Sequence, residues 1–143
     1  MKKSVYIRLA GRDYPLNFSL GACKVITKEL GSLENIEKTL AEKFDANTID
    51  KISTILCTLI AQGCAYKNLF EIDPGTYDVD EAENPALGED GRFKALKKDE
   101  LEVALGFEDI GEIITKIGEC VGASSVTEVE AKKPKNEKPP EEA

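Results

Sequence analysis

Residues 48–70, with the sequence TIDKISTILCTLIAQGCAYKNLF, carry the pattern that decides the fold. Apolar positions recur at alternating steps of three and four, which is the spacing of one face of an α-helix. Ile55 and Ile60 widen this face, as expected for a helix that several elements contact. The sequence therefore predicts that a long helix, begun by Asp45 or Asn47, is the spine of the domain. Its predicted core positions are Ile49, Ile52, Leu56, Leu59, Gly63, Tyr66 and Phe70.

A segment of alternating apolar residues comes first in the chain. Two short runs with strand periodicity flank the turn sequence AGRD at residues 10–13, which predicts a β-hairpin over residues 4–18 with one apolar face. Pro15 cannot donate a ladder hydrogen bond, so its strand lies at an edge or turns its nitrogen toward solvent. An isolated hairpin is not stable in water, and we therefore expect it to pack on helices. The apolar face comprises Val5, Ile7, Leu9, Tyr14, Leu16 and Phe18.

Two shorter helices are expected between the hairpin and the spine. One covers residues 19–30, with Ser19 as its N-cap and Gly31 at its end, and the other covers residues 32–43 after Ser32. Apolar residues at helical spacing in both segments are expected to face the core. They are Leu20, Cys23, Ile26, Leu30, Leu33, Ile36 and Leu40.

The segment after the spine is strongly acidic. Residues 71–90 carry eight acidic side chains and no basic one, and prolines and glycines interrupt every regular pattern. The sequence predicts a solvated acidic loop over residues 71–97. A calcium loop at residues 78–83 is a minor alternative, because the segment lacks the third alternating ligand and has Glu83 where such loops need glycine.

Two further helices are predicted at residues 98–105, with Asp99 as a candidate cap, and at residues 107–122. The apolar stripe of the last helix fits two roles: it closes the core of the bundle, or it binds a partner or a second copy of the chain. Gly111, Gly118 and Gly122 would let another backbone approach it. The partner-binding hypothesis concerns Phe107, Ile110, Ile114, Ile117 and Val121.

The overall composition indicates one domain followed by a tail. A chain of 143 residues with 41% hydrophobic content can fill a single core. We predict an α+β fold, mostly α, in which an N-terminal β-hairpin packs on a small bundle of four to five helices within residues 1–122. Residues 123–143 are rich in proline and charge and are predicted to form a disordered charged tail, either a solubilising tether or a segment that orders on a partner.

The composition also excludes most chemistry. The chain has no histidine, so the commonest general base and metal ligand is missing. The four cysteines form no C-x-x-C pair and lie in apolar helical patterns, which favours reduced core thiols. Phosphate-binding glycine motifs are absent, and no carboxylate stands beside a nucleophile. We expect no enzymatic activity, no metal and no cofactor, although catalysis by carboxylates alone remains the least favoured alternative.

Charge and hydropathy constrain the location and the partners. A net charge of −8 disfavours binding to nucleic acid, whose phosphates require a basic face. The longest apolar stretch, residues 55–61, is too short to cross a bilayer. The start Met1-Lys2-Lys3 is not followed by the apolar block of a signal peptide. The sequence therefore predicts a cytoplasmic protein that contacts neither nucleic acid nor membrane.

One stretch of sequence resembles a known family. Residues 6–18, YIRLAGRDYPLNF, followed by Ser19-Leu20-Gly21-Ala22, resemble the tail assembly chaperones of siphophages and prophages of Gram-positive bacteria. The resemblance covers residues 5–70, and residues 71–122 are similar only in helical content. In that family a strand, turn and strand precede helices of about these lengths and a polar extension.

The resemblance implies a function and partners. Such chaperones bind the tape measure protein, prevent its apolar surfaces from aggregating, help to recruit tail tube protein, and are absent from the mature virion. They act in the cytoplasm of the bacterial host. Many relatives also have a longer form made by ribosomal frameshifting, for which codons at Lys132-Lys133 are a candidate site. The alternative interpretation is a generic cytosolic adaptor or small regulatory protein-binding module.

Overall fold

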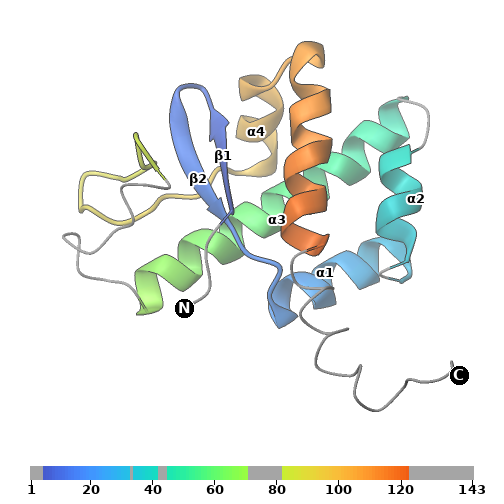
Figure 1. Ribbon diagram of the computed structural model, residues 1–143, viewed down its shortest axis with the longest axis horizontal. Coiled ribbons are helices and arrows are strands. Elements are labelled where there is room, and N and C mark those ends of the chain that lie inside the picture. Colours follow the sequence, from blue (N-terminus) through green and yellow to red (C-terminus); the bar gives the residue numbers. More distant parts are fainter. Residues whose placement is uncertain (1–4, 33, 42–44, 71–81, 123–143) are drawn as a thin grey trace, which may run out of the picture.

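The computed structural model describes residues 5–32, 34–41, 45–70 and 82–122. It has the predicted α+β, mostly α fold, in which an antiparallel hairpin packs on helices (Figure 1). The elements, in chain order, are β1 (Val5–Leu9), β2 (Arg12–Leu16), α1 (Leu20–Leu30), α2 (Asn35–Ala41), α3 (Ala46–Phe70), α4 (Lys98–Ala104) and the 3-10 helix η2 (Phe107–Asp109). A last helix follows directly at residues 110–122.

Helix α3 is the spine, as predicted. It contacts β2, α1, α2 and α4, and Leu56, Leu59 and Ile60 in its middle are completely buried. With 25 residues at about 1.5 Å each, α3 is about 37 Å long, whereas a five-residue strand spans only about 17 Å. The elements packed on it also bury Thr48 and Lys67, which lie near its two ends. The predicted core positions Ile49, Tyr66 and Phe70 are nevertheless exposed.

The hairpin has a tighter turn than predicted. Ala10 and Gly11 both have positive φ, 52° and 80°, and form a two-residue loop, so that Arg12 and Asp13 already belong to β2. Pro15 pairs with Tyr6 and is buried against α3. A methyl group on Gly63 of α3 would overlap the Pro15 carbonyl group, so the missing side chain lets strand and helix backbones meet.

Helix α1 begins and ends as predicted, but its buried face differs. The Ser19 hydroxyl accepts a hydrogen bond from the backbone nitrogen of Ala22 at 3.1 Å, and Gly31 ends the helix with a φ of 95°. Ala22 and Ile26 are completely buried, whereas Leu20 is 88% exposed. Leu20 stands two residues before Ala22, about 200° around the helix, so the prediction that it faces the core is wrong.

Helix α2 is described over a shorter range than residues 32–43. Ile36 is buried as predicted and Leu40 is partly buried, while Leu33, residues 42–43 and the side chain of Glu37 lie outside the described residues. Thr39 is also buried.

Residues 82–97 correct the prediction of a solvated loop. The backbone nitrogen of Asp13 donates to the Asn84 carbonyl at 2.8 Å, and the nitrogen of Ala86 donates to the Asp13 carbonyl at 2.9 Å, so this segment extends the edge of β2. Ala82, Ala86 and Phe93 are buried. These three residues are irregularly spaced and give no periodic signal. The acidic composition of the segment therefore leads to the prediction of a solvated loop. Residues 71–81, including most of the calcium-loop alternative, and the predicted tail lie outside the described residues.

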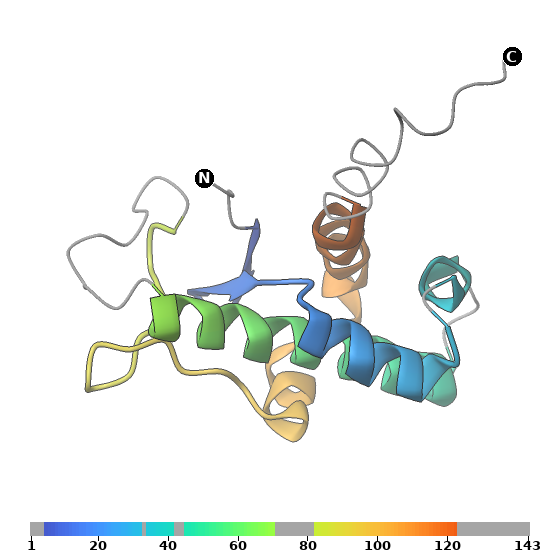
Figure 2. The same cartoon turned by 90° about the horizontal axis from the view of Figure 1, so that it is seen from below.

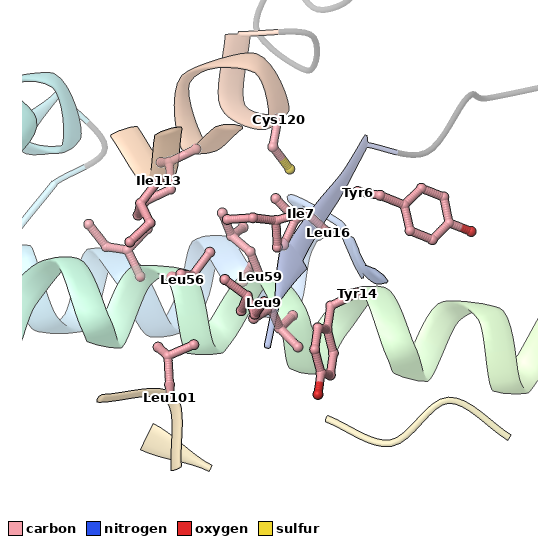
Figure 3. Packing of buried hydrophobic residues seen from close by; sticks show 14 of the residues in the cluster. Tyr6, Ile7, Leu9, Tyr14, Leu16, Leu56, Leu59, Leu101, Ile113 and Cys120 are labelled. Carbon is pink, nitrogen blue, oxygen red and sulfur yellow. The ribbon is translucent and has the colours of Figure 1, made fainter. Parts of the chain in front are cut away.

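Helix α4 and the 110–122 helix lie on opposite sides of α3, and the hairpin shares the side of the 110–122 helix (Figure 2). Leu101 and Ile113 point toward the Leu56 region of α3 from these two sides (Figure 3). Asp99 is not the N-cap of α4. The N-cap is Lys97, whose backbone nitrogen donates to the Glu100 carboxylate at 2.9 Å.

Candidate functional site

An apolar groove lies where the chain passes from α4 around α3 to the last helix. It has a volume of about 550 Å³, within the range of about 300–1,000 Å³ typical of ligand-binding clefts. The N-terminal half of α3 forms one wall, and the end of α4, η2 and the start of the 110–122 helix form the other. We call it the α3–α4 groove. Its lining residues are Ala46, Ile49, Asp50, Ile52, Ser53, Leu56, Glu102, Leu105, Gly106, Phe107, Ile110 and Ile113.

The groove contains two of the five predicted partner-binding residues. Phe107 is 76% exposed, and Ile110 is partly buried beside it. Ile117, by contrast, is completely buried in the core of the domain. Ile114 and Val121 are partly buried, and Val121 packs against that core. The structure therefore divides the predicted stripe between an open groove and the core.

Part of this division follows from where the last helix begins. The sequence pattern places the start of the last helix at Phe107, but residues 107–109 form a 3-10 turn and the α-helix begins at residue 110. The buried face then runs through Ile113, Ile117 and Cys120, at steps of four and three. Ile113 was missed because residues 113 and 114 are both isoleucine, and composition alone cannot choose between them.

Local capping holds Phe107 at the open side of the groove. The backbone nitrogen of Gly106 donates to the Asp109 carboxylate at 2.8 Å, which fixes the 3-10 turn. The Glu108 carboxylate lies over Gly106, 2.6 Å from where a side-chain carbon would stand. Glycine leaves this space for the carboxylate, and Gly106 and the exposed ring of Phe107 line the groove.

The charged residues of the groove are acidic. Asp50 and Glu102 are the charged lining residues, and Asp50 on the α3 wall pairs with Lys98 at 2.5 Å. The hydrogen bond to Asp50 raises the pKa of Lys98, and the charge of Glu102 contributes to this shift. Glu102 on the opposite wall and Glu108 beside it, outside the lining, have no ion pair within the described part of the chain. Residues 99–115 contain six acidic side chains and no basic one.

Asp13 is the most connected buried carboxylate of the described residues, and its role is structural. It accepts two hydrogen bonds from the Arg8 guanidinium at 2.9 Å each and one from the Asn84 backbone nitrogen at 2.9 Å. Chiefly because of the Arg8 hydrogen bonds, the pKa of Asp13 is below its usual range. Its acceptor sites are occupied, which suits the joining of the hairpin to residues 82–97 and does not suit proton transfer.

The thiols show the features of core residues. All four cysteines are free, and Cys64 and Cys120 are buried. Burial raises the pKa of Cys64 to about 12 and also raises that of Cys57, so neither forms a thiolate at neutral pH. Within the described ranges, no group of three or more potential ligands could hold a metal ion.

Comparison with known proteins gave no match to a family model, a curated protein or a solved structure. No helix in the described part of the chain has both the length and the apolar character needed to span a membrane. What the groove can do chemically follows from its shape and lining. An open apolar trough with an aromatic side chain at its edge suits the docking of an amphipathic helix.

Proposed function

We propose that this protein is a non-enzymatic tail assembly chaperone of a siphophage or prophage. It binds the tape measure protein in the cytoplasm of the bacterial host, keeps it soluble, and helps to recruit tail tube protein before leaving the assembling tail. The observation that carries the proposal is the α3–α4 groove with Phe107 exposed at its edge. The order of hairpin and helices, for which the sequence resemblance was noted, is consistent with it.

The physical problem of tail assembly matches such a groove. The tape measure protein is long and helical, and it exposes apolar stripes until the tail tube encloses it. Exposed stripes of this kind self-associate. Docking of a stripe in the groove would remove apolar surface from water, which contributes about 25 cal/mol for each Å² buried. The net charge of −8 on each bound chaperone would then cause tape measure proteins with bound chaperone to repel one another.

Co-expression with the tape measure protein of the same phage tests the proposal. We expect the tape measure protein to become soluble and to co-purify with this chain. Phe107→Ser should abolish co-purification, whereas Phe70→Ser should not, because Phe70 is similarly exposed, at 71%, but lies at the far end of α3 outside the groove. A tape measure protein that is equally soluble alone and never co-purifies would refute the proposal and favour a generic adaptor.

A further inference from the structure

We propose that the α3–α4 groove selects amphipathic helices that carry lysine or arginine along the edge of their apolar stripe. This inference deepens the proposed function, on which it rests, by naming the chemistry of the segment that binds. Two features of the groove lead to this inference, its apolar floor and the acidic side chains at its walls. The net negative charge of the whole chain is the third observation.

The floor and one edge of the groove supply apolar contacts. Ile52, Leu56 and Ile113 are buried at its base, while Ile49 and Phe107 are exposed on its two walls. An occupant that covers both exposed side chains must present a continuous apolar stripe. An amphipathic helix does so with residues at steps of three and four.

The walls determine which residues can flank that stripe. On the α3 wall, Asp50 forms an ion pair with Lys98 of α4, which also interacts electrostatically with Glu102. On the opposite wall, Glu102 lines the groove and is exposed, and the exposed carboxylate of Glu108 lies outside the lining, over Gly106. Neither glutamate has an ion pair within the described residues. A docked helix would bring its flanking side chains next to these two carboxylates. Lysine or arginine there gains attraction, while glutamate or aspartate meets repulsion.

Charge also argues against the two occupants that this chain could itself supply. A second copy would bring another net charge of −8, and a symmetric contact would set acidic wall against acidic wall. The segment 123–143 contains lysines, but Val126 and Val129 are its only sizeable aliphatic residues and three prolines interrupt it. It cannot present an apolar stripe. A basic helix from another protein is the occupant that fits.

Synthetic helices test the inference on the intact protein. Three peptides of about three heptads share a leucine stripe and differ only in the flanking residues, which are lysine, glutamine or glutamate. Fluorescence anisotropy measures their Kd at about 0.05 M and about 0.5 M salt. We expect the lysine peptide to bind about fivefold more tightly than the glutamine peptide at low salt, since each exposed ion pair changes affinity about two- to threefold. The glutamate peptide should bind most weakly.

Matched variants assign this preference to the groove. Glu102→Gln with Glu108→Gln should remove the advantage of lysine over glutamine, whereas Glu83→Gln with Glu89→Gln changes the net charge equally and should preserve it. Both control residues are exposed and lie outside the groove. Phe107→Ser should weaken binding of every peptide, while Phe70→Ser should not. An equal Kd for the lysine and glutamine peptides would overturn the inference, as would an advantage that survives neutralisation of Glu102 and Glu108.

The outcomes separate this inference from the proposed function. If the tape measure protein co-purifies but the lysine preference is absent, the charge selection is wrong and the chaperone proposal stands. If the peptides behave as expected but the tape measure protein does not bind, the groove takes basic helices from a different partner. A dimer by analytical ultracentrifugation that Phe107→Ser dissociates would show that a second copy occupies the groove, and would overturn the inference.

Discussion

Gly63 is where two backbones meet, and its substitution tests how tightly the hairpin is seated. An added Cβ would overlap the Pro15 carbonyl group and stand 2.8 Å from the Leu16 nitrogen, with no flexible side chain to yield. We expect Gly63→Ala to lower the free energy of unfolding by about 3 kcal/mol, the upper range for overpacking. Gly111→Ala is the matched control, because its Cβ meets nothing within 4 Å. The control should be neutral or stabilising by about 1 kcal/mol in urea unfolding.

Asp13 gives a prediction with a defined dependence on pH. Its pKa is lower in the folded chain than the ordinary 3.8, so the charged carboxylate stabilises the fold at neutral pH. This contribution is lost as the pH falls below 3.8 through the folded pKa. Asp13→Asn should cost about 2 kcal/mol at pH 7, because charge-assisted hydrogen bonds contribute about 1.5–3 kcal/mol. The difference from the wild type should shrink as the solution is acidified.

Urea unfolding across the acid range measures this effect, and Glu83 provides the comparison. Its side chain is exposed and approaches Arg8 only at 3.4 Å, so Glu83→Gln should change stability little at any pH. A difference between wild type and Asp13→Asn that stays constant down to the lowest pH would contradict the assignment of the effect to ionised Asp13.

Asn68 of α3 is a second attachment point of the segment 82–97, beside Asp13 of the hairpin. The Asn68 amide donates to the Phe93 carbonyl and accepts from the Phe93 nitrogen, both at 2.9 Å, and so acts as a short strand partner. We expect Asn68→Ala to cost about 1–2 kcal/mol, because two backbone groups lose their partner. Hydrogen exchange of the Gly88 and Lys94 amides should accelerate, while that of the α1 amides should stay unchanged. Equal acceleration in both places would indicate global destabilisation instead.

Helices and strands with a strong local sequence signal could be predicted. The face that each of them buries depends on its neighbours in space and often could not be predicted. The Ser19 cap and the Gly31 stop of α1 follow from side-chain chemistry within one turn, and both were predicted. The exposure of Leu20 depends on where α3 lies, which no local pattern encodes. Composition and periodicity do not predict the packing of segment 82–97, because it comes from hydrogen bonds to distant residues such as Asp13 and Asn68.

Only part of the α3–α4 groove could be predicted from the sequence. Phe107 and Ile110 were predicted as partner-binding residues from apolar spacing, and they do border it. Its other wall consists of α3 residues such as Ile49 and Ser53, which helical spacing and composition cannot pair with a segment fifty residues later. Ile117 is buried with Ile113 and Cys120 at helical spacing, which is the core-closing role that the sequence left open. The 3-10 turn at η2, held by the Asp109 cap, places Phe107 outside this helical face, and periodicity did not predict it.

Net charge and exposed apolar surface act together on the molecule as a whole. At neutral pH the charge of −8 opposes contact between copies, although Phe70 and Phe107 are open to solvent. Near the pI of about 4.7 this repulsion vanishes, while the low pKa of Asp13 keeps the hairpin attached.

The second virial coefficient from static light scattering should therefore be positive at pH 7 and negative near pH 4.7. Phe70→Ser with Phe107→Ser should make the acidic value less negative, because apolar contact requires the rings. A coefficient that stays positive at the pI would mean that the apolar surface is too small to drive association, and would weaken the case for the groove as a docking surface.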